Sequence, residues 1–234
     1  MLRERLAVDQ NNQLLPVRDT DQQPSNPVIR LLANLVSYVF HPLFIPIYLI
    51  WFLMFAEPQL FAGFDPRERL LVLIRFFIMY SFFPLVTVLL AKALGFLSSV
   101  HLRTQKERII PYMACGIYYF WMSYVLRHQP EFAREVVLLA MSIFVAASIG
   151  LIVNIYMKVS MHAMAIGIMI GFVTMLSLQT AGFTLYMSAA LLIGGIVCTA
   201  RMIVSDHFPR EIYIGLLTGI VSLLVSIWAD GILP

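Results

Sequence analysis

The sequence predicts an all-α membrane protein, a polytopic helical bundle with six to seven transmembrane helices. Apolar residue types make up 60% of the 234 residues and charged types only 12%, and the mean hydropathy is +0.84. Soluble domains are about 45–50% apolar. Here the charges gather between apolar stretches long enough to cross a bilayer, at about 20 residues per crossing. The net charge of +3, without a basic stripe of interleaved aromatic residues, argues against a nucleic-acid partner.

Seven apolar stretches are candidate transmembrane helices. They occupy residues 31–56, 70–97, 110–126, 135–157, 162–180, 183–199 and 212–229. Pro42 and Pro46 interrupt the first stretch, which predicts either one crossing or a surface helix followed by a short re-entrant piece. The fifth and sixth stretches are separated only by Ala181 and Gly182. Because the two together are about twice as long as a bilayer is thick, we expect a helical hairpin.

The chain divides into a polar N-terminal tail, residues 1–27, and a single transmembrane domain, residues 28–234. The tail contains no short apolar core followed by a small-residue cleavage site, so we expect it to be retained. Cys115 and Cys198 lie within apolar stretches, where a free cysteine behaves as a small hydrophobe, so no disulfide is expected. We expect a multi-pass protein of the cell (inner) membrane, in contact with the lipid bilayer.

The polar residues that are unusual for a membrane protein fall into three segments, 101–111, 158–162 and 201–211. Two crossings separate each segment from the next, so all three are expected to emerge at the same membrane face. Their candidate functional residues are Arg103, Lys106, Arg108, Lys158, Ser160, His162, Arg201, His207 and Glu211. Cations this close together repel each other unless an anion binds among them.

The histidines and the glutamate need more than an interfacial explanation. Lys and Arg near helix ends commonly extend to the interface, which explains the cations alone. Ionisable groups at membrane depth are functional candidates. His207 and Glu211 are four residues apart, so on a helix they share one face, where the carboxylate can hold an imidazole N–H. Ser160 and His162 lie where a helix begins, and helix N-termini favour an anion such as phosphate.

Two glycine pairs predict close packing between the fifth and the seventh stretch. Gly167 and Gly171 are spaced as Gly-x-x-x-Gly, and so are Gly215 and Gly219. This spacing lets helix backbones approach each other in lipid. We therefore expect these two helices to bring His162 opposite His207.

In these motifs the chain resembles the type-2 phosphatidic acid phosphatase family, membrane lipid phosphatases that share a helical core with the vanadium haloperoxidases. The resemblance covers about residues 101–219. The segment from Arg201 through His207 to Glu211 is similar to the pattern Ser-Arg-x5-His-x3-Asp, with Ala200 in place of the serine and Glu211 in place of the aspartate. Val159-Ser160-Met161-His162 is similar to Pro-Ser-Gly-His.

The first motif of the family, Lys-x6-Arg-Pro, has only an approximate counterpart. The approximate counterpart is the segment from Arg103 to Pro111. If Arg108 is taken as the motif arginine, the lysine position falls just before this segment, at His101. The resemblance nevertheless implies a core like that of the acid phosphatases and vanadium haloperoxidases. It implies hydrolysis of a phosphomonoester or diphosphate on a lipid head group, of the phosphatidic acid, phosphatidylglycerol phosphate or isoprenoid phosphate class.

The resemblance also assigns roles to the site residues. His207 would be the nucleophile that forms a phosphohistidine, Glu211 would orient it, and His162 would be the general acid and base. The groups that would bind the phosphate are Arg201, Arg108, Lys158, Ser160, Arg103 and Lys106. The expected partner is a lipid phosphate substrate. No metal and no cofactor is expected, because the sequence offers no paired inward carboxylates for a two-metal site.

Two other functions remain open. A secondary transporter of an anion also places Arg, His and Glu within the membrane, and its hallmark is a pair of inverted repeats with helices broken at the midplane. Pro42, Pro46 and Pro84 lie in the first two stretches, with no counterpart in the second half. The other alternative is a catalytically degenerate membrane member of the same family.

Overall fold

The computed structural model describes residues 6–8, 14–16, 26–99, 102, 104–204 and 208–232. Its elements are, in chain order, β1 Leu6–Val8, β2 Leu14–Pro16, α1 Pro27–Val39, α2 Ile45–Ala56, the 3-10 helix η2 Pro58–Phe61, α3 Pro66–Phe77, the π-helical turn η3 Ile78–Phe82, α4 Phe83–Ala93, α5 Gln105–Arg127, α6 Arg134–Tyr156, α7 Met161–Gln179, α8 Thr184–Val204 and α9 Pro209–Asp230. β1 and β2 form an antiparallel pair. Most of the predicted tail lies outside the described residues.

Six helical segments are long and apolar enough to cross a membrane. They are Pro66–Ala93, which joins α3, η3 and α4, and then α5, α6, α7, α8 and α9. Each overlaps one predicted stretch, with ends that agree within about five residues. The prediction of a multi-pass membrane protein with a helical transmembrane domain is therefore confirmed.

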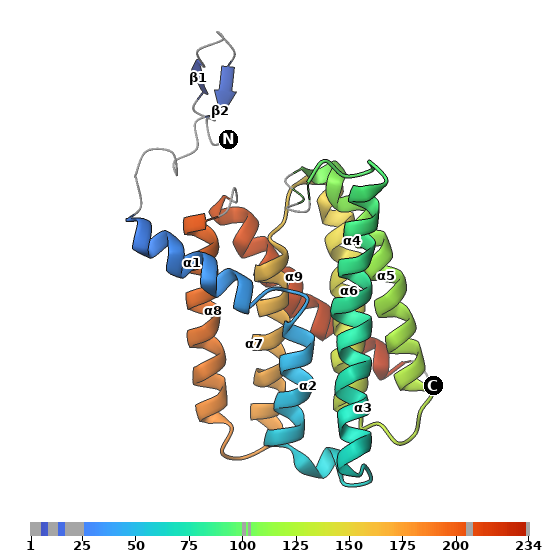
Figure 1. Cartoon of the computed structure of the whole chain (residues 1–234). Coiled ribbons are helices and arrows are strands. Elements are labelled where there is room, and N and C mark those ends of the chain that lie inside the picture. The colour runs from blue at the N-terminus through green and yellow to red at the C-terminus, as the bar shows by residue number, and fades with distance from the viewer. Residues whose placement is uncertain are drawn as a thin grey trace.

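Successive spanning helices run in alternating directions (Figure 1). α5, α7 and α9 all begin at one end of the bundle, and α4, α6 and α8 end there. We call this end the polar end, because the three polar segments predicted to converge belong to these helix termini. The turns at 128–133 and 180–183 lie at the opposite end.

The first predicted stretch forms two short helices. α1 and α2 are separated by residues 40–44, which contain His41 and Pro42. α1 lies across α8 close to the polar end, and α2 continues beside α3 toward the opposite end (Figure 1). The prolines thus predict the interruption correctly, and the two helices together extend from one end of the bundle to the other.

A hydrogen bond from the neighbouring helix stabilises this interruption. The Ser81 hydroxyl donates to the Leu43 backbone carbonyl at 2.6 Å. Ser81 belongs to η3, and π-helical turns are rare features that often occur near functional sites. A backbone carbonyl without a partner is costly within a membrane, so this bond makes the break between α1 and α2 tolerable.

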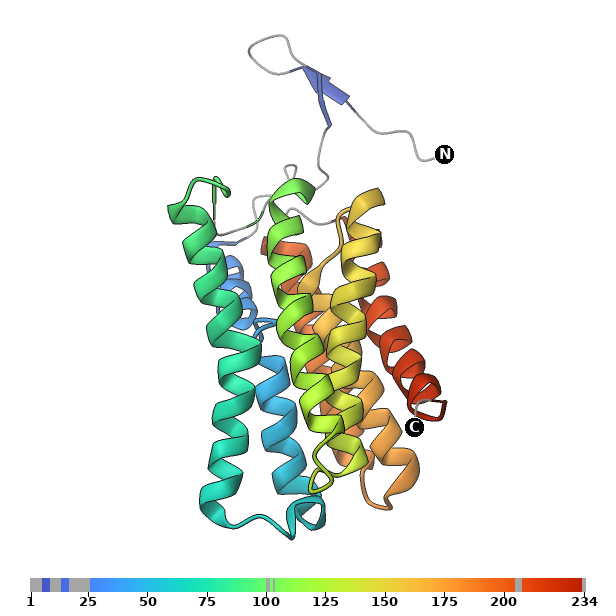
Figure 2. The same ribbon diagram turned by 90° about the vertical axis from the view of Figure 1, so that its right-hand side faces the viewer.

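α7 and α9 pack closely because glycines lie at their contact. A Cβ added to Gly219 would lie 2.1 Å from the Met164 carbonyl oxygen, and one added to Gly167 would lie 2.2 Å from the Leu216 carbonyl oxygen. Only glycine leaves room for these backbones, so the predicted close packing of these two helices is confirmed. α9 is inclined to α6, which it also contacts (Figure 2).

Candidate functional site

Seven of the nine predicted site residues lie in the described part of the chain. They are Lys106, Arg108, Lys158, Ser160, His162, Arg201 and Glu211. All seven belong to the first turns of α5, α7 and α9, the last turn of α8, or the residues just before α7, so they lie toward the polar end (Figure 1). Arg103 and His207 lie outside the described residues.

Arg108 joins two of the three polar segments. α5 begins at Gln105, earlier than predicted, because Thr104 and Glu107 form a capping box at its N-terminus. Arg108 therefore lies in the first turn, with only 6% of its surface exposed. Its Nε donates to the Leu102 carbonyl oxygen at 2.9 Å and its Nη1 to the Val159 carbonyl oxygen at 2.6 Å. These acceptors offset part of the cost of burying the charge.

A reciprocal pair of hydrogen bonds links the start of α5 to the end of α6. The Gln105 side-chain amide donates to the Asn154 backbone carbonyl, and the Asn154 side-chain amide donates to the Gln105 backbone carbonyl, both at 2.9 Å. Asn154 is buried. The sequence suggests Asn154 only through its position four residues before Lys158.

Two buried polar atoms, one on α6 and one on α5, have no hydrogen-bond partner among the described residues. They are the Asn154 Oδ1 and the hydroxyl of Tyr112, whose side chain is close enough to Arg108 to interact with it electrostatically. Leaving a buried polar atom unpaired costs about 1–3 kcal/mol, so such atoms mark a place where a polar group can bind. Tyr112 received no role from the sequence, although it lies on the same helix face as Arg108.

Ser160 and Glu211 connect the second segment to the third. The Ser160 backbone N–H donates to the Glu211 backbone carbonyl at 3.2 Å. The Ser160 hydroxyl accepts from the Ala163 backbone N–H at 3.4 Å and so caps α7. A Cβ on Gly215 would lie 2.7 Å from the Ser160 carbonyl oxygen, so glycine is needed for this approach. Both Ser160 and Glu211 are buried.

The ionised groups of this cluster act on one another. Arg108 and Arg201 are near enough for their like charges to repel, and Glu211 attracts Arg108. Arg201 is half-buried in the last turn of α8. Two guanidinium groups held together in a poorly solvated place favour the binding of an anion.

His162 contacts the break in the first stretch. Its Nε2 lies 3.1 Å from the Ser37 backbone carbonyl oxygen. A carbonyl oxygen only accepts hydrogen bonds, so Nε2 carries a proton in this arrangement. The ring of His41 lies edge-on to that of His162, with centroids 5.3 Å apart, and His41 also interacts electrostatically with Arg201.

The contact with the first stretch is the main feature that sequence reasoning missed. The usable signal was His41, a histidine beside a proline that interrupts an apolar stretch. Lys106 is exposed and is not drawn into the buried cluster, whereas Lys158 is half-buried. The predicted meeting of His162 with His207 stays a prediction, because His207 lies outside the described residues.

The described residues contain no group of three or more His, Cys, Asp or Glu side chains that could hold a metal ion. The cluster combines guanidinium groups, a capped helix N-terminus and an imidazole, which are groups that can bind an anion. Comparison of the chain with protein-family models, with curated proteins and with solved structures found no match.

Proposed function

We propose that this protein is a membrane lipid phosphatase, which hydrolyses a phosphomonoester or diphosphate on a lipid head group through a phosphohistidine. One observation carries the proposal. Arg108, Ser160 and Glu211, which come from three segments far apart in the chain, are buried at one end of a membrane bundle and connected by hydrogen bonds and charge. These are also the segments in which the sequence resembles the type-2 phosphatidic acid phosphatases.

In the first step of the proposed reaction, the His207 imidazole attacks the phosphorus atom. A nitrogen–phosphorus bond forms as the bond to the lipid oxygen breaks, and His162 gives that oxygen a proton. Glu211 accepts the second ring N–H of His207 and stabilises the developing imidazolium. The products of this step are a phosphohistidine and a lipid with one phosphate fewer, which is a lipid monophosphate if the substrate is a diphosphate.

In the second step, water attacks the phosphohistidine while His162 removes its proton. The nitrogen–phosphorus bond breaks, and inorganic phosphate leaves. The contact between His162 and Ser37 supports this role, because Nε2–H stays bonded to the carbonyl and Nδ1 is the atom that gains and loses a proton. A fixed tautomer and ring orientation are what a general acid and base requires.

The phosphate oxygens would be bound by the cations of the cluster. Arg108 and Arg201 offer planar forks that match two oxygens at once, and Lys158 offers a single charge. Ser160 and the backbone N–H groups that begin α7 add neutral donors. Arg103 and Lys106 are second-choice ligands. Such donors stabilise the negative charge spread over the oxygens during phosphoryl transfer.

A phosphate-release assay on purified protein tests the proposal. The substrates are phosphatidic acid, phosphatidylglycerol phosphate, and isoprenoid mono- and diphosphates in detergent micelles. We expect wild type to release phosphate from at least one of them. We expect His207→Ala to release none while its thermal unfolding stays unchanged, because the nucleophile alone is lost.

His128→Ala is the matched control. His128 is exposed after α5, at the opposite end of the bundle, so its loss should leave turnover intact. Normal turnover by His207→Ala would remove that residue as the nucleophile. A wild-type protein inactive on every lipid would favour a degenerate family member or another function.

The break between α1 and α2 favours one other function, a secondary transporter of an anion. Transporters use helices interrupted within the membrane to build their binding sites. Against this, α6, α7, α8 and α9 are each continuous, so the second half has no described counterpart of the break. Anion uptake into proteoliposomes without release of phosphate from any lipid would favour the transporter.

A further inference from the structure

An apolar groove of about 500 Å³ lies between α1 and α8. Ala33 and Val36 line it from α1, and Gly195, Thr199, Ala200 and Ile203 are among its residues on α8. The lining is apolar except for the threonine hydroxyl and backbone atoms. This volume is within the range of about 300–1,000 Å³ that is common for ligand pockets.

Two residues that line the groove are chain neighbours of groups in the candidate site. On α8, Ala200 lines the groove and the next residue is Arg201. On α1, Val36 lines the groove and the next residue is Ser37, whose carbonyl contacts His162. The groove therefore runs along the turns of α1 and α8 that carry Ser37 and Arg201.

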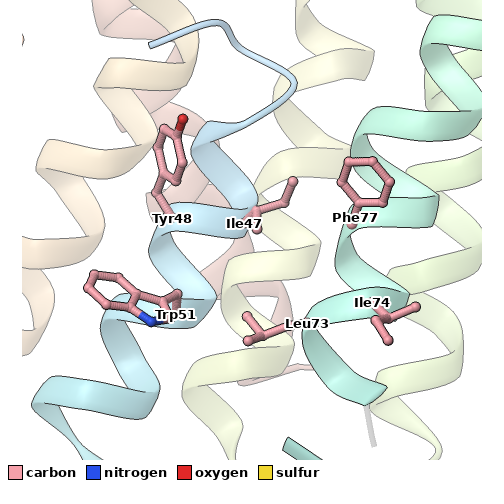
Figure 3. A pocket seen from close by; sticks show the side chains of 6 residues that line it. All are labelled: Ile47, Tyr48, Trp51, Leu73, Ile74 and Phe77. Carbon is pink, nitrogen blue, oxygen red and sulfur yellow. The ribbon is translucent and has the colours of Figure 1, made fainter. Parts of the chain in front are cut away.

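A second groove of similar size lacks this connection. It has a volume of about 520 Å³ and lies between α2 and α3 (Figure 3). Ile47, Tyr48 and Trp51 line it from α2, and Leu73, Ile74 and Phe77 line it from α3. None of them is a candidate site residue. The nearby Arg75 binds the Gln129 side chain at 2.7 Å, beyond the end of α5 away from the polar end. We regard this groove as an ordinary lipid-facing crevice.

We propose that the groove between α1 and α8 binds the hydrocarbon chain of the phosphate-bearing lipid substrate. The chain would enter sideways from the bilayer, and its head group would then lie beside Arg201 and His162. This inference rests on the proposed function and narrows its substrate class to lipid phosphates with a chain long enough to fill the groove. Because the chain is already in hydrocarbon, the groove selects it by van der Waals packing, and the cation end sets the orientation.

Gly195 offers a way to fill the groove without disturbing the protein. It lines the groove, and a Cβ added to it would meet no atom within 4 Å. A leucine there would therefore occupy the space assigned to the lipid chain. Gly116 in α5 also has no atom within 4 Å of an added Cβ, and it does not line the groove, so Gly116→Leu is the matched control.

The experiment compares two substrates that share a head group. One is the long-chain lipid phosphate that wild type hydrolyses fastest, and the other is its counterpart with six-carbon chains. We expect Gly195→Leu to raise KM for the long-chain lipid at least tenfold and to leave KM and kcat for the short-chain lipid within twofold of wild type. Gly116→Leu should match wild type on both.

Two results would overturn the groove assignment while the phosphatase proposal stands. The first is an unchanged KM of Gly195→Leu for the long-chain lipid, since the chain would then bind elsewhere. The second is an equal loss on both lipids, since chain length would then not matter.

A photo-crosslinking experiment covers the case in which wild type releases no phosphate and the phosphatase proposal fails. The probe is a phosphatidic acid with a diazirine in its acyl chain. Labelling of residues 191–203 that unlabelled phosphatidic acid competes away, and phosphatidylcholine does not, would retain the groove as a binding site for lipid phosphates. Equal competition by both lipids would assign the groove to bulk bilayer lipid.

Discussion

At the scale of single residues, the site depends on backbone carbonyls as much as on charged side chains. Arg108 donates to two carbonyl oxygens, those of Leu102 and Val159, and His162 donates to the carbonyl oxygen of Ser37. Each carbonyl fixes the direction of its donor without neutralising the charge. The charge of the guanidinium group is therefore balanced only in part, by its attraction to Glu211.

The ring contact between His41 and His162 leads to a prediction. Contacts between aromatic rings contribute about 0.5–1.5 kcal/mol, and 1.4 kcal/mol corresponds to a factor of ten in rate. If His41 positions His162 by packing, His41→Ala should lower kcat for lipid phosphate up to about tenfold with little change in KM. His41→Phe keeps a ring at this place and should retain most of the activity.

The comparison of these two variants separates packing from chemistry. An equal loss of kcat in His41→Phe and His41→Ala would show that the imidazole of His41 itself takes part. The exposed His128→Ala variant again serves as the control.

The residue types of the candidate site are readable from the sequence, but their partners are not. Ser160, His162 and Glu211 stand out because polar groups are rare in apolar stretches. The acceptor for His162 is a main-chain carbonyl of Ser37, a group that every residue possesses, so no sequence pattern marks it. The contact of His41 is equally hidden in the sequence, because its partner, His162, is more than a hundred residues away in the chain.

At the scale of helices, glycine placement determines which elements meet. Gly167 in α7 and Gly215 and Gly219 in α9 allow backbone contact, and this contact brings the start of α7 against the start of α9. The hydrogen bond between the Ser160 N–H and the Glu211 carbonyl depends on this approach. The packing of α7 against α9 thus also brings together the residues of the candidate site at the polar end.

Gly219→Ala tests this dependence. An added methyl group would overlap the Met164 carbonyl oxygen, so the helices must separate. Overpacking of this kind costs about 1–3 kcal/mol, and backbone atoms relax less readily than side chains. We expect a lower unfolding temperature in detergent and a loss of phosphate release.

Gly116→Ala is the control for this variant, because its added methyl group meets nothing within 4 Å. It should be as stable as wild type or slightly more so, since alanine favours a helix over glycine. Wild-type stability in Gly219→Ala would show that α7 and α9 tolerate a wider separation.

Helix existence follows from the sequence more accurately than helix boundaries do. The apolar stretches identify each spanning helix, because lipid permits little else of that length. α5 begins five residues before the predicted residue 110. The reason is the capping box of Thr104 and Glu107, whose polar residues extend the helix beyond the membrane core and leave no signal in the hydropathy. The break between α1 and α2 is readable from Pro42, whereas the partner that stabilises it, Ser81, is not.

At the scale of the whole molecule, the alternation of helices fixes which connections share a side. Lys106, near the start of α5, and His128, just after its end, are both exposed and lie at opposite ends of the bundle (Figure 1). Each is therefore a convenient place for a reporter of sidedness. Because the six spanning segments alternate in direction, the two positions are expected to be accessible from opposite sides of the membrane.

Cysteine accessibility in intact cells checks this arrangement. In a background with Cys115 and Cys198 replaced by alanine, Lys106→Cys and His128→Cys should react with a membrane-impermeant thiol reagent from opposite sides. The side on which Lys106→Cys reacts is the side of the candidate site. Reaction of both variants from the same side would contradict the alternating bundle.

The close contact between α7 and α9 also has a consequence for biosynthesis. The glycine face of α7 emerges from the ribosome well before α9, so it must contact lipid or the insertion machinery while α8 is being made. During that interval Ser160 lacks the Glu211 carbonyl that its backbone N–H will bind. The candidate site of a nascent chain is consequently incomplete until α9 has inserted and packed against α7.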